Sequence, residues 1–182
     1  NYGVKPDIIT MAKGITSAYL PLSATAVRKE IYEAFKGTEE YDYFRHVNTF
    51  GGHPAACALA LKNIEIMERE NLFARSREAG ERLLNELKNK LQDHPYVGDV
   101  RGKGLLIGIE LVADKDTKEP LDVSLVNKAI GICKENGLII GKNGTTVAGY
   151  NNVLTLSPPL NIEDDDLSFL INTLTDALWK MK

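Results

Sequence analysis

The chain has 182 residues, of which 43% are hydrophobic and 26% charged, and its formal net charge is −3. These values are typical of a folded globular protein, and the mixed charges lack the basic stripe of a nucleic-acid-binding protein. No apolar run approaches the roughly 20 residues of a membrane-spanning helix, and no signal peptide is visible. We therefore expect a cytoplasmic protein that binds neither nucleic acid nor membrane.

The cysteines and histidines predict neither a disulfide nor a metal site. Cys57 and Cys133 lie far apart, each in an apolar helical context, which is typical of buried free thiols in a reducing compartment. His46 and His53 are separated by two glycines among other residues, and His94 precedes a proline in a loop. This spacing does not match a metal-binding motif, so we expect no metal.

The first part of the chain predicts two strands and two helices. The sequence pattern predicts strands over 6–13 and 22–27 and a short helix over 28–36. Pro54 suits the first position of a helix, which we expect to continue over 55–70. The first turns of that helix are apolar all round and predict burial, whereas its charged last turns predict a surface position.

From residue 71 onward, helices and strands alternate, which predicts a small α/β domain over 71–182 after a first domain over 1–70. A long amphipathic helix is expected over 71–92, because its leucines keep helical spacing. A turn is expected at 101–104, and Ser124 could cap a later helix. The other predicted elements are strands over 97–100, 105–112, 138–140 and 153–156, and helices over 124–136 and 161–181.

Lys13 ends a short apolar run and is followed by Gly14, which would let the chain turn sharply. Ile8, Ile9 and Met11 in this run predict a buried strand. A lysine at the end of a buried strand is costly unless its amine is neutral, paired or covalently used, and a desolvated lysine can form a Schiff base with an aldehyde. Two hypotheses stay open: a reactive lysine, or one that snorkels or forms a salt bridge.

The segment 48–54 places the hydroxyl of Thr49 and two glycines before a predicted helix start. Orphan backbone N–H groups at a helix N-terminus attract phosphate, and glycines allow its close approach. An ordinary junction between a loop and a helix is the alternative. The Gly102 and Gly104 pair does not predict a dinucleotide site, because a strand rather than a helix is expected to follow it.

Four segments in register resemble the class III aminotransferases, the ω-amino-acid transaminases that use pyridoxal 5'-phosphate (PLP): 13–24, 48–54, 100–111 and 156–160. The resemblance covers essentially the whole chain. It implies an α/β protein of the aspartate-aminotransferase-like fold type I. Residues 1–70 would be the C-terminal part of the PLP-binding large domain with the interdomain helix, and residues 71–182 the small C-terminal α/β domain.

Part of the family pattern has no match in this chain. The glycine-serine phosphate loop, the aromatic residue that stacks on the pyridine ring and the aspartate that pairs with the ring nitrogen should all lie upstream of Asn1. We therefore expect a fragment of a larger enzyme, inactive by itself.

The resemblance also implies roles for individual residues. Lys13 would form the Schiff base with PLP and move a proton between substrate and cofactor. Thr49 would donate a hydrogen bond to the PLP phosphate of the neighbouring subunit, so that a homodimer shares its active sites, and Phe50 could add a backbone contact. Tyr19 could line the substrate pocket, although core packing explains it equally well.

Substrate selection departs from the family pattern. Many relatives place a carboxylate-binding arginine after the strand expected at 138–140, but residues 141–152 contain no arginine. Lys142 could supply a point charge, and Asn151 or Asn152 could donate hydrogen bonds, although lysine is not equivalent to arginine. The segment leaves room for an ω-amino acid or an aminosulfonate as substrate.

The predicted function is PLP-dependent transamination from an ω-amino acid or similar amine, such as taurine or β-alanine, to a keto acid such as pyruvate. Three alternatives stay open: a diaminopelargonate synthase-type aminotransferase, another PLP reaction on the same fold (a decarboxylase or aminomutase), and a non-catalytic domain fragment. Only transamination requires a keto-acid co-substrate, so product analysis separates it from the other PLP reactions.

Overall fold

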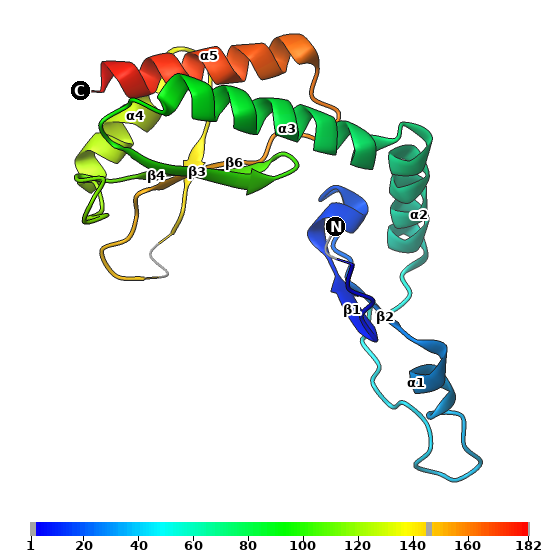
Figure 1. Ribbon diagram of the computed structural model, residues 1–182. Coiled ribbons are helices and arrows are strands. Elements are labelled where there is room, and N and C mark those ends of the chain that lie inside the picture. Colours follow the sequence, from blue (N-terminus) through cyan, green and yellow to red (C-terminus); the bar gives the residue numbers. More distant parts are fainter. Residues whose placement is uncertain (1–2, 145–146, 182) are drawn as a thin grey trace. The chain divides into compact units, whose positions relative to one another are not determined.

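The computed structural model describes residues 3–144 and 147–181. The chain divides into two compact units, Asn1–Glu70 and Asn71–Lys182 (Figure 1). Each unit is described by itself below.

The first unit contains a two-stranded antiparallel sheet in which Ile8 pairs with Val27 and Met11 with Ala24. The strands are joined through a short 3-10 turn that begins at Lys13. The elements of the unit are β1 (Ile8–Met11), η1 (Lys13–Thr16), β2 (Ala24–Val27), α1 (Lys29–Glu33) and α2 (Pro54–Arg69). All four predicted elements therefore exist, but both strands and α1 are shorter than predicted.

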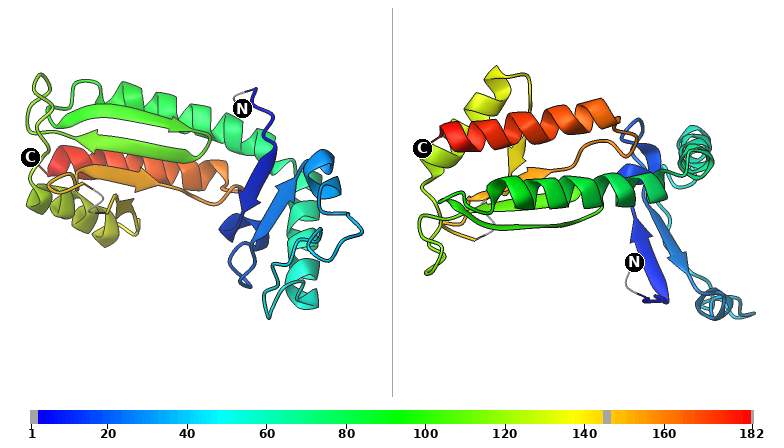
Figure 2. Two further views of the ribbon diagram at one scale, coloured as in Figure 1. Left: turned by 90° about the horizontal axis from the view of Figure 1, so that it is seen from below. Right: turned by 45° about the horizontal axis from the view of Figure 1, so that its top comes forward.

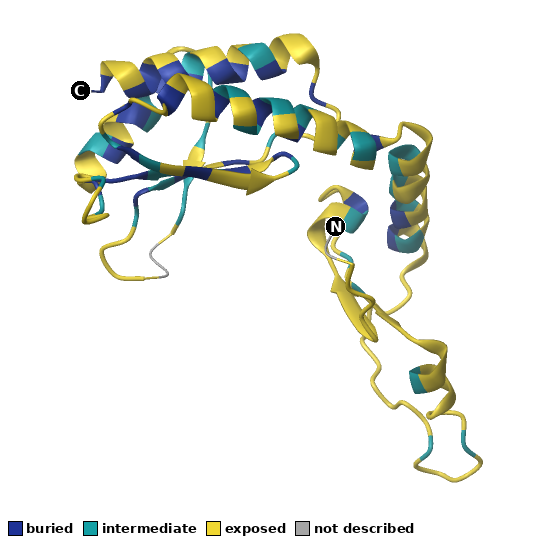
Figure 3. Ribbon diagram, viewed as in Figure 1, coloured by how far each residue is buried: buried dark blue, intermediate teal, exposed yellow. Residues whose placement is uncertain are grey.

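The expected burial of the first unit is wrong. Ile8 is 54% exposed and Ile9 43% exposed, because β1 pairs only with β2 and, within this unit, its faces are largely uncovered. The first turns of α2 are not buried all round either: Ala56 and Ala60 are buried, whereas Leu61 is 70% exposed. Most of the first unit is exposed (Figure 3). An apolar sequence indicates a preference for burial, but burial itself needs covering residues.

The second unit packs helices against an antiparallel sheet with the strand order β3-β4-β6-β5. Helices α3, α4 and α5 lie along one face of this sheet (Figure 2). The elements are α3 (Leu72–Leu91), β3 (Val97–Lys103), β4 (Leu106–Leu111), α4 (Val123–Glu135), β5 (Gly141–Lys142), β6 (Val153–Leu156) and α5 (Asp164–Lys180). The predicted mixture of helices and strands is confirmed, with antiparallel pairing between the strands.

The hydrophobic core of the second unit lies between the sheet and the helices. Along β4, Ile107, Ile109 and Leu111 are buried, in alternation with less buried residues, as the two-residue period of a strand requires. Leu83 and Leu87 of α3 are also fully buried in this core. Burial of each such side chain contributes about 1.5–3 kcal/mol, so this unit has the core that the first unit lacks.

Two strands of the second unit differ from the prediction. β3 continues through the expected turn to Lys103, and the chain reverses at Gly104, whose φ of +55° suits glycine. The strand expected at 138–140 lies instead at Gly141–Lys142, where Thr155 and Leu154 of β6 provide pairing partners. In both places, pairing across strands rather than local apolar character decides the boundary.

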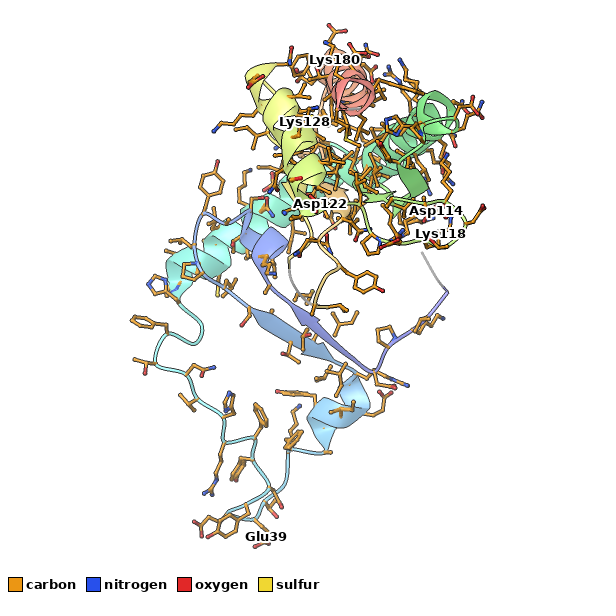
Figure 4. All side chains as sticks on the ribbon, turned by 90° about the vertical axis from the view of Figure 1, so that its left-hand side faces the viewer. Glu39, Asp114, Lys118, Asp122, Lys128 and Lys180 are labelled. Atoms are coloured by element: carbon orange, nitrogen blue, oxygen red, sulfur yellow. The ribbon has the colours of Figure 1, made fainter. Side chains whose placement is uncertain are left out.

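Asp122, rather than the predicted Ser124, caps α4 (Figure 4). The Ser124 backbone N–H donates to Asp122 Oδ1 at 2.8 Å, and the Ser124 hydroxyl donates to the same oxygen. These hydrogen bonds, led by that of the hydroxyl, lower the pKa of Asp122. Asp114, in the loop before Lys118, likewise accepts from the Thr117 N–H at 2.8 Å, which lowers its pKa.

Among the described residues, no helix has both the length and the apolar character needed to cross a lipid bilayer.

Two glycines in helices of the second unit provide a matched test of its packing. A Cβ at Gly80 would lie 2.1 Å from the Gly104 carbonyl oxygen, whereas a Cβ at Gly131 would meet no neighbouring atom within 4 Å. We expect Gly80→Ala to lower the free energy of unfolding by about 1–3 kcal/mol through overpacking. Gly131→Ala should raise it by about 0.5–1 kcal/mol, because alanine favours the helix. Urea unfolding of the 182-residue chain measures both, and equal effects would contradict the close approach at Gly80.

Candidate active site

The turn after β1 holds Lys13 in an unusual backbone conformation. Lys13 has a φ of +53°, and Ser17 and Ala18 have φ values of +47° and +63°. Left-handed backbone costs an L-residue roughly 1–2 kcal/mol. Of these two neighbours, Lys13 and not Gly14 has the positive φ, so the sharp turn expected at Gly14 is made by Lys13 itself.

Hydrogen bonds from two polar residues hold this turn in place. The buried Thr16 hydroxyl donates to the Leu20 carbonyl oxygen at 2.7 Å. Asn63 of α2 donates through Nδ2 to the carbonyl oxygens of Gly14 at 2.9 Å and Ile15 at 3.2 Å. Neither Thr16 nor Asn63 was expected from the sequence to hold the turn. An asparagine in the interior of a helix, where its type is disfavoured, is the signal that could have indicated Asn63.

The second candidate segment is a tight turn that leads into α2. The Gly51 N–H donates to the Asn48 carbonyl oxygen at 2.8 Å, and the His53 N–H donates to that of Phe50 at 3.2 Å. Gly52 has a φ of +67°, and a Cβ at Gly51 would lie 3.0 Å from the Asn48 oxygen. Gly52 therefore suits its left-handed backbone, and a side chain at Gly51 would crowd the Asn48 oxygen; the segment ends where α2 begins at Pro54.

The turn at Lys13 and the segment before α2 line one open hollow of about 800 Å³. Of the predicted site residues, Lys13 and Phe50 are among those that line it. Thr49 is exposed beside Phe50 but is not a lining residue, and neither is Tyr19, which is 78% exposed. The lining residues are Lys13, Thr16, Ala18, Leu20, Pro21, Leu22, Ser23, Asn48, Phe50, Gly51 and Gly52.

Lys13 is exposed within this unit, so the predicted desolvation of its amine is not found. The reason is the one given for β1: this strand pairs only with β2, so no other described part of the unit covers the end of β1 that leads to Lys13. The described residues that line the hollow include this one basic side chain and no carboxylate. The hollow can therefore attract an anion and present a primary amine to it.

The predicted substrate residues of the second unit have different surroundings. Lys142 is half-buried on β5. Asn152 is 2% exposed, and its Nδ2 donates to the Leu111 carbonyl oxygen at 2.6 Å, so its amide already stabilises the sheet and is not available to a substrate. Asn151 is half-buried.

The Gly102 and Gly104 pair belongs to a β-hairpin, and the strand expected after the pair is confirmed as β4. The neighbouring Arg101 Nη1 lies 2.8 Å from Asp99 Oδ2 and 2.5 Å from Glu110 Oε2. Hydrogen bonds to these carboxylates, first that of Asp99, raise the pKa of Arg101. Arg101 therefore joins the two strands of the hairpin.

The described residues contain no group of three or more His, Cys, Asp or Glu side chains placed to hold a metal ion.

Comparison with known proteins identifies the family. The family model for class III aminotransferases matches residues 1–178. The uncharacterized aminotransferase YhxA of Bacillus subtilis is 67% identical over 97% of this chain and 39% of its own length. The taurine–pyruvate aminotransferase of Bilophila wadsworthia is 43% identical over 97% of this chain and 39% of its own length. The crystal structure of a Bacillus anthracis aminotransferase is 65% identical, with a TM-score of 0.93 over 98% of this chain and 40% of that one.

The chain thus spans about 40% of the length of the relatives that it matches. The predicted fold type I is confirmed by the close match to a solved aminotransferase structure. The chain belongs to the class III aminotransferases, a family of PLP-dependent enzymes.

Proposed function

We propose that the complete enzyme carrying these 182 residues transfers an amino group from an ω-amino acid or similar amine, such as taurine or β-alanine, to a keto acid such as pyruvate. The observation that carries this proposal is that Lys13 and Phe50, from two separate family motifs, line one hollow. The relative that acts on taurine and pyruvate, 43% identical to this chain, supports the choice of substrates.

The hollow fits PLP, which carries an aldehyde and a phosphate. Lys13 supplies the primary amine that an aldehyde requires. The glycines before α2 let the backbone come close to a phosphate, and no carboxylate among the described lining residues would repel it. We therefore propose that residues 1–70 belong to the PLP-binding domain and residues 71–182 form the small domain.

In the proposed mechanism, PLP supplies an electron sink that makes the C–H bond beside the substrate amine acidic. Lys13 would hold the cofactor through its Nζ. When free, the Lys13 amine would accept the proton from the substrate carbon and later donate it, as general base and then general acid. The left-handed backbone of Lys13 sets the direction in which its side chain leaves the turn.

Thr49 and Phe50 would bind the cofactor phosphate, with Thr49 acting across the interface of a homodimer. Thr49 is exposed and lies outside the lining of the hollow, which suits a residue that serves a neighbouring subunit. Tyr19 and Lys142 would contact the substrate, with the positive charge of Lys142, a half-buried residue, attracting its anionic end. A carboxylate or sulfonate at that end would be bound by charge rather than by the planar fork of an arginine.

We also propose that the enzyme works in the cytoplasm. Cys57 and Cys133 are both free thiols, which suits a reducing compartment. Burial raises the pKa of Cys133 to about 11, so this thiol is protonated and packs as an apolar side chain.

Lys13 should be the residue to which PLP is attached in the complete enzyme. Borohydride reduction followed by peptide mapping should place the pyridoxyl group on Lys13. Lys13→Ala should lower transaminase turnover by about three orders of magnitude or more, because the covalent step and the proton transfer are both lost. The exposed Lys5 provides the control, since Lys5→Ala should keep normal turnover. Pyridoxyl label on another lysine would refute the assignment.

Thr49→Ala should weaken PLP binding by about 1.5–3 kcal/mol, the scale of a hydrogen bond to a charged group, whereas Thr49→Ser, which keeps the hydroxyl, should bind PLP nearly normally. A mixed dimer of Lys13→Ala and Thr49→Ala chains should regain activity, because one of its two sites would contain both native residues. Activity no higher than in the two parent variants would place the Thr49 contact within its own subunit.

The 182-residue chain alone should not retain PLP through dialysis or show the visible absorption of a stable Schiff base. Its hollow is open, and binding without a preorganised pocket is weak and reversible. In hydrogen exchange, amides of residues 71–182 should be protected by their core, whereas those of residues 3–50 should exchange fast. Stoichiometric PLP after dialysis would show that the cofactor site is complete in this chain.

A further inference from the structure

The turn at Lys13 needs support from outside its own residues. Three non-glycine residues within six positions, Lys13, Ser17 and Ala18, have left-handed backbone. Such conformations persist where the surrounding structure holds them, and they concentrate at functional sites. The local hydrogen bonds of the 3-10 turn are long, at 3.4 Å from the Ile15 N–H to the Ala12 oxygen and 3.3 Å from the Ser17 N–H to the Gly14 oxygen.

Asn63 provides that support with its whole side-chain amide. Nδ2 donates to the carbonyl oxygens of Gly14 and Ile15, and Oδ1 accepts from the Ser17 hydroxyl at 2.8 Å. The three hydrogen bonds thus connect Asn63 to residues on both sides of the turn, from Gly14 to the left-handed Ser17. A rotation of the backbone at Lys13 would therefore break contacts on the opposite side of the turn.

Helix α2 is thereby connected to both segments that line the hollow, the turn at Lys13 and the segment before Pro54. It begins at Pro54, directly after the segment that contains Phe50 and Gly52, and Asn63 lies further along the same helix. Because an α-helix is stiff over this length, the Asn63 hydrogen bonds set the position of the Lys13 turn relative to the segment before Pro54.

We propose that Asn63 is a positioning residue for Lys13: it holds the left-handed turn so that the Lys13 amine meets a cofactor bound at the segment before Pro54. This inference rests on the proposed function of Lys13. Asn63 touches neither substrate nor cofactor in this proposal, and acts only through the backbone of the turn.

The test uses three variants of the complete enzyme. Asn63→Asp keeps the size of the side chain but replaces the Nδ2 donor by an oxygen that faces the two carbonyl groups. Lys62→Gln is the matched control, because it also lowers the net charge by one unit. The Lys62 Nζ donates a hydrogen bond to Glu65 Oε1 at 2.7 Å, on the same helix and not to the turn. Ser17→Ala removes one of the three hydrogen bonds and should give a smaller effect in the same direction.

The first measurement is amide hydrogen exchange of the cofactor-free enzyme. In Asn63→Asp, the peptide covering residues 12–20 should exchange about tenfold faster or more, while α2 and the urea midpoint of unfolding stay near the unmodified values. Lys62→Gln should leave this peptide unchanged. Unchanged exchange of the peptide in Asn63→Asp overturns the proposal, as does faster exchange that spreads over the whole unit with a lower urea midpoint, which would show a purely structural role.

The second measurement is cofactor attachment. The PLP concentration that half-saturates Lys13, followed by its visible absorption and by borohydride trapping, should rise about tenfold in Asn63→Asp, equivalent to about 1.4 kcal/mol. A normal value in this variant overturns the proposal even if exchange is faster. The Lys13→Ala enzyme separates the two claims, since full activity of that variant would refute the proposed function while the exchange result for Asn63 would stand.

Discussion

The hydrogen bonds from Asn63 to the Gly14 and Ile15 carbonyl oxygens connect the turn at Lys13 to helix α2. They join the turn after β1 to a helix that lies far from it in sequence. Without them, a lysine with left-handed backbone would be held by the long hydrogen bonds of a short 3-10 turn and by the Thr16 hydroxyl, all within residues 12–20. The hollow, and the proposed chemistry at Lys13, follow from this connection.

The two units differ in how their structures are stabilised. In the second, the buried residues of β4 pack against leucines of α3, and a sheet of four strands closes one side of a continuous core. In the first, the buried residues of the described chain are Thr16, Ala56 and Ala60, so little apolar surface is buried. This contrast accords with a chain that spans about 40% of its relatives.

The helices were predictable because their periodicity is local, and α3 and its leucines confirm this. Lys13 and Phe50 were predictable as site candidates because family motifs mark them, and the structure places both at one hollow. The left-handed backbone at Lys13, the position of β5 and the role of Asn152 were not predictable. Each depends on a partner distant in sequence, as when Asn152 donates to Leu111, and periodicity carries no information on such partners.

The close approach of α3 to the β3–β4 hairpin has a consequence for how this unit can change by mutation. The Gly104 carbonyl oxygen occupies the space that any side chain at Gly80 would need. Gly104 in turn has a positive φ, and a Cβ there would lie 2.9 Å from the Ser76 hydroxyl. A larger residue at Gly80 therefore requires the helix to move away from the hairpin, because it meets backbone atoms. At Gly104 a larger residue would strain the backbone and displace the Ser76 side chain. Evolution of this part of the unit is thus constrained at two positions that lie on different elements but face one another.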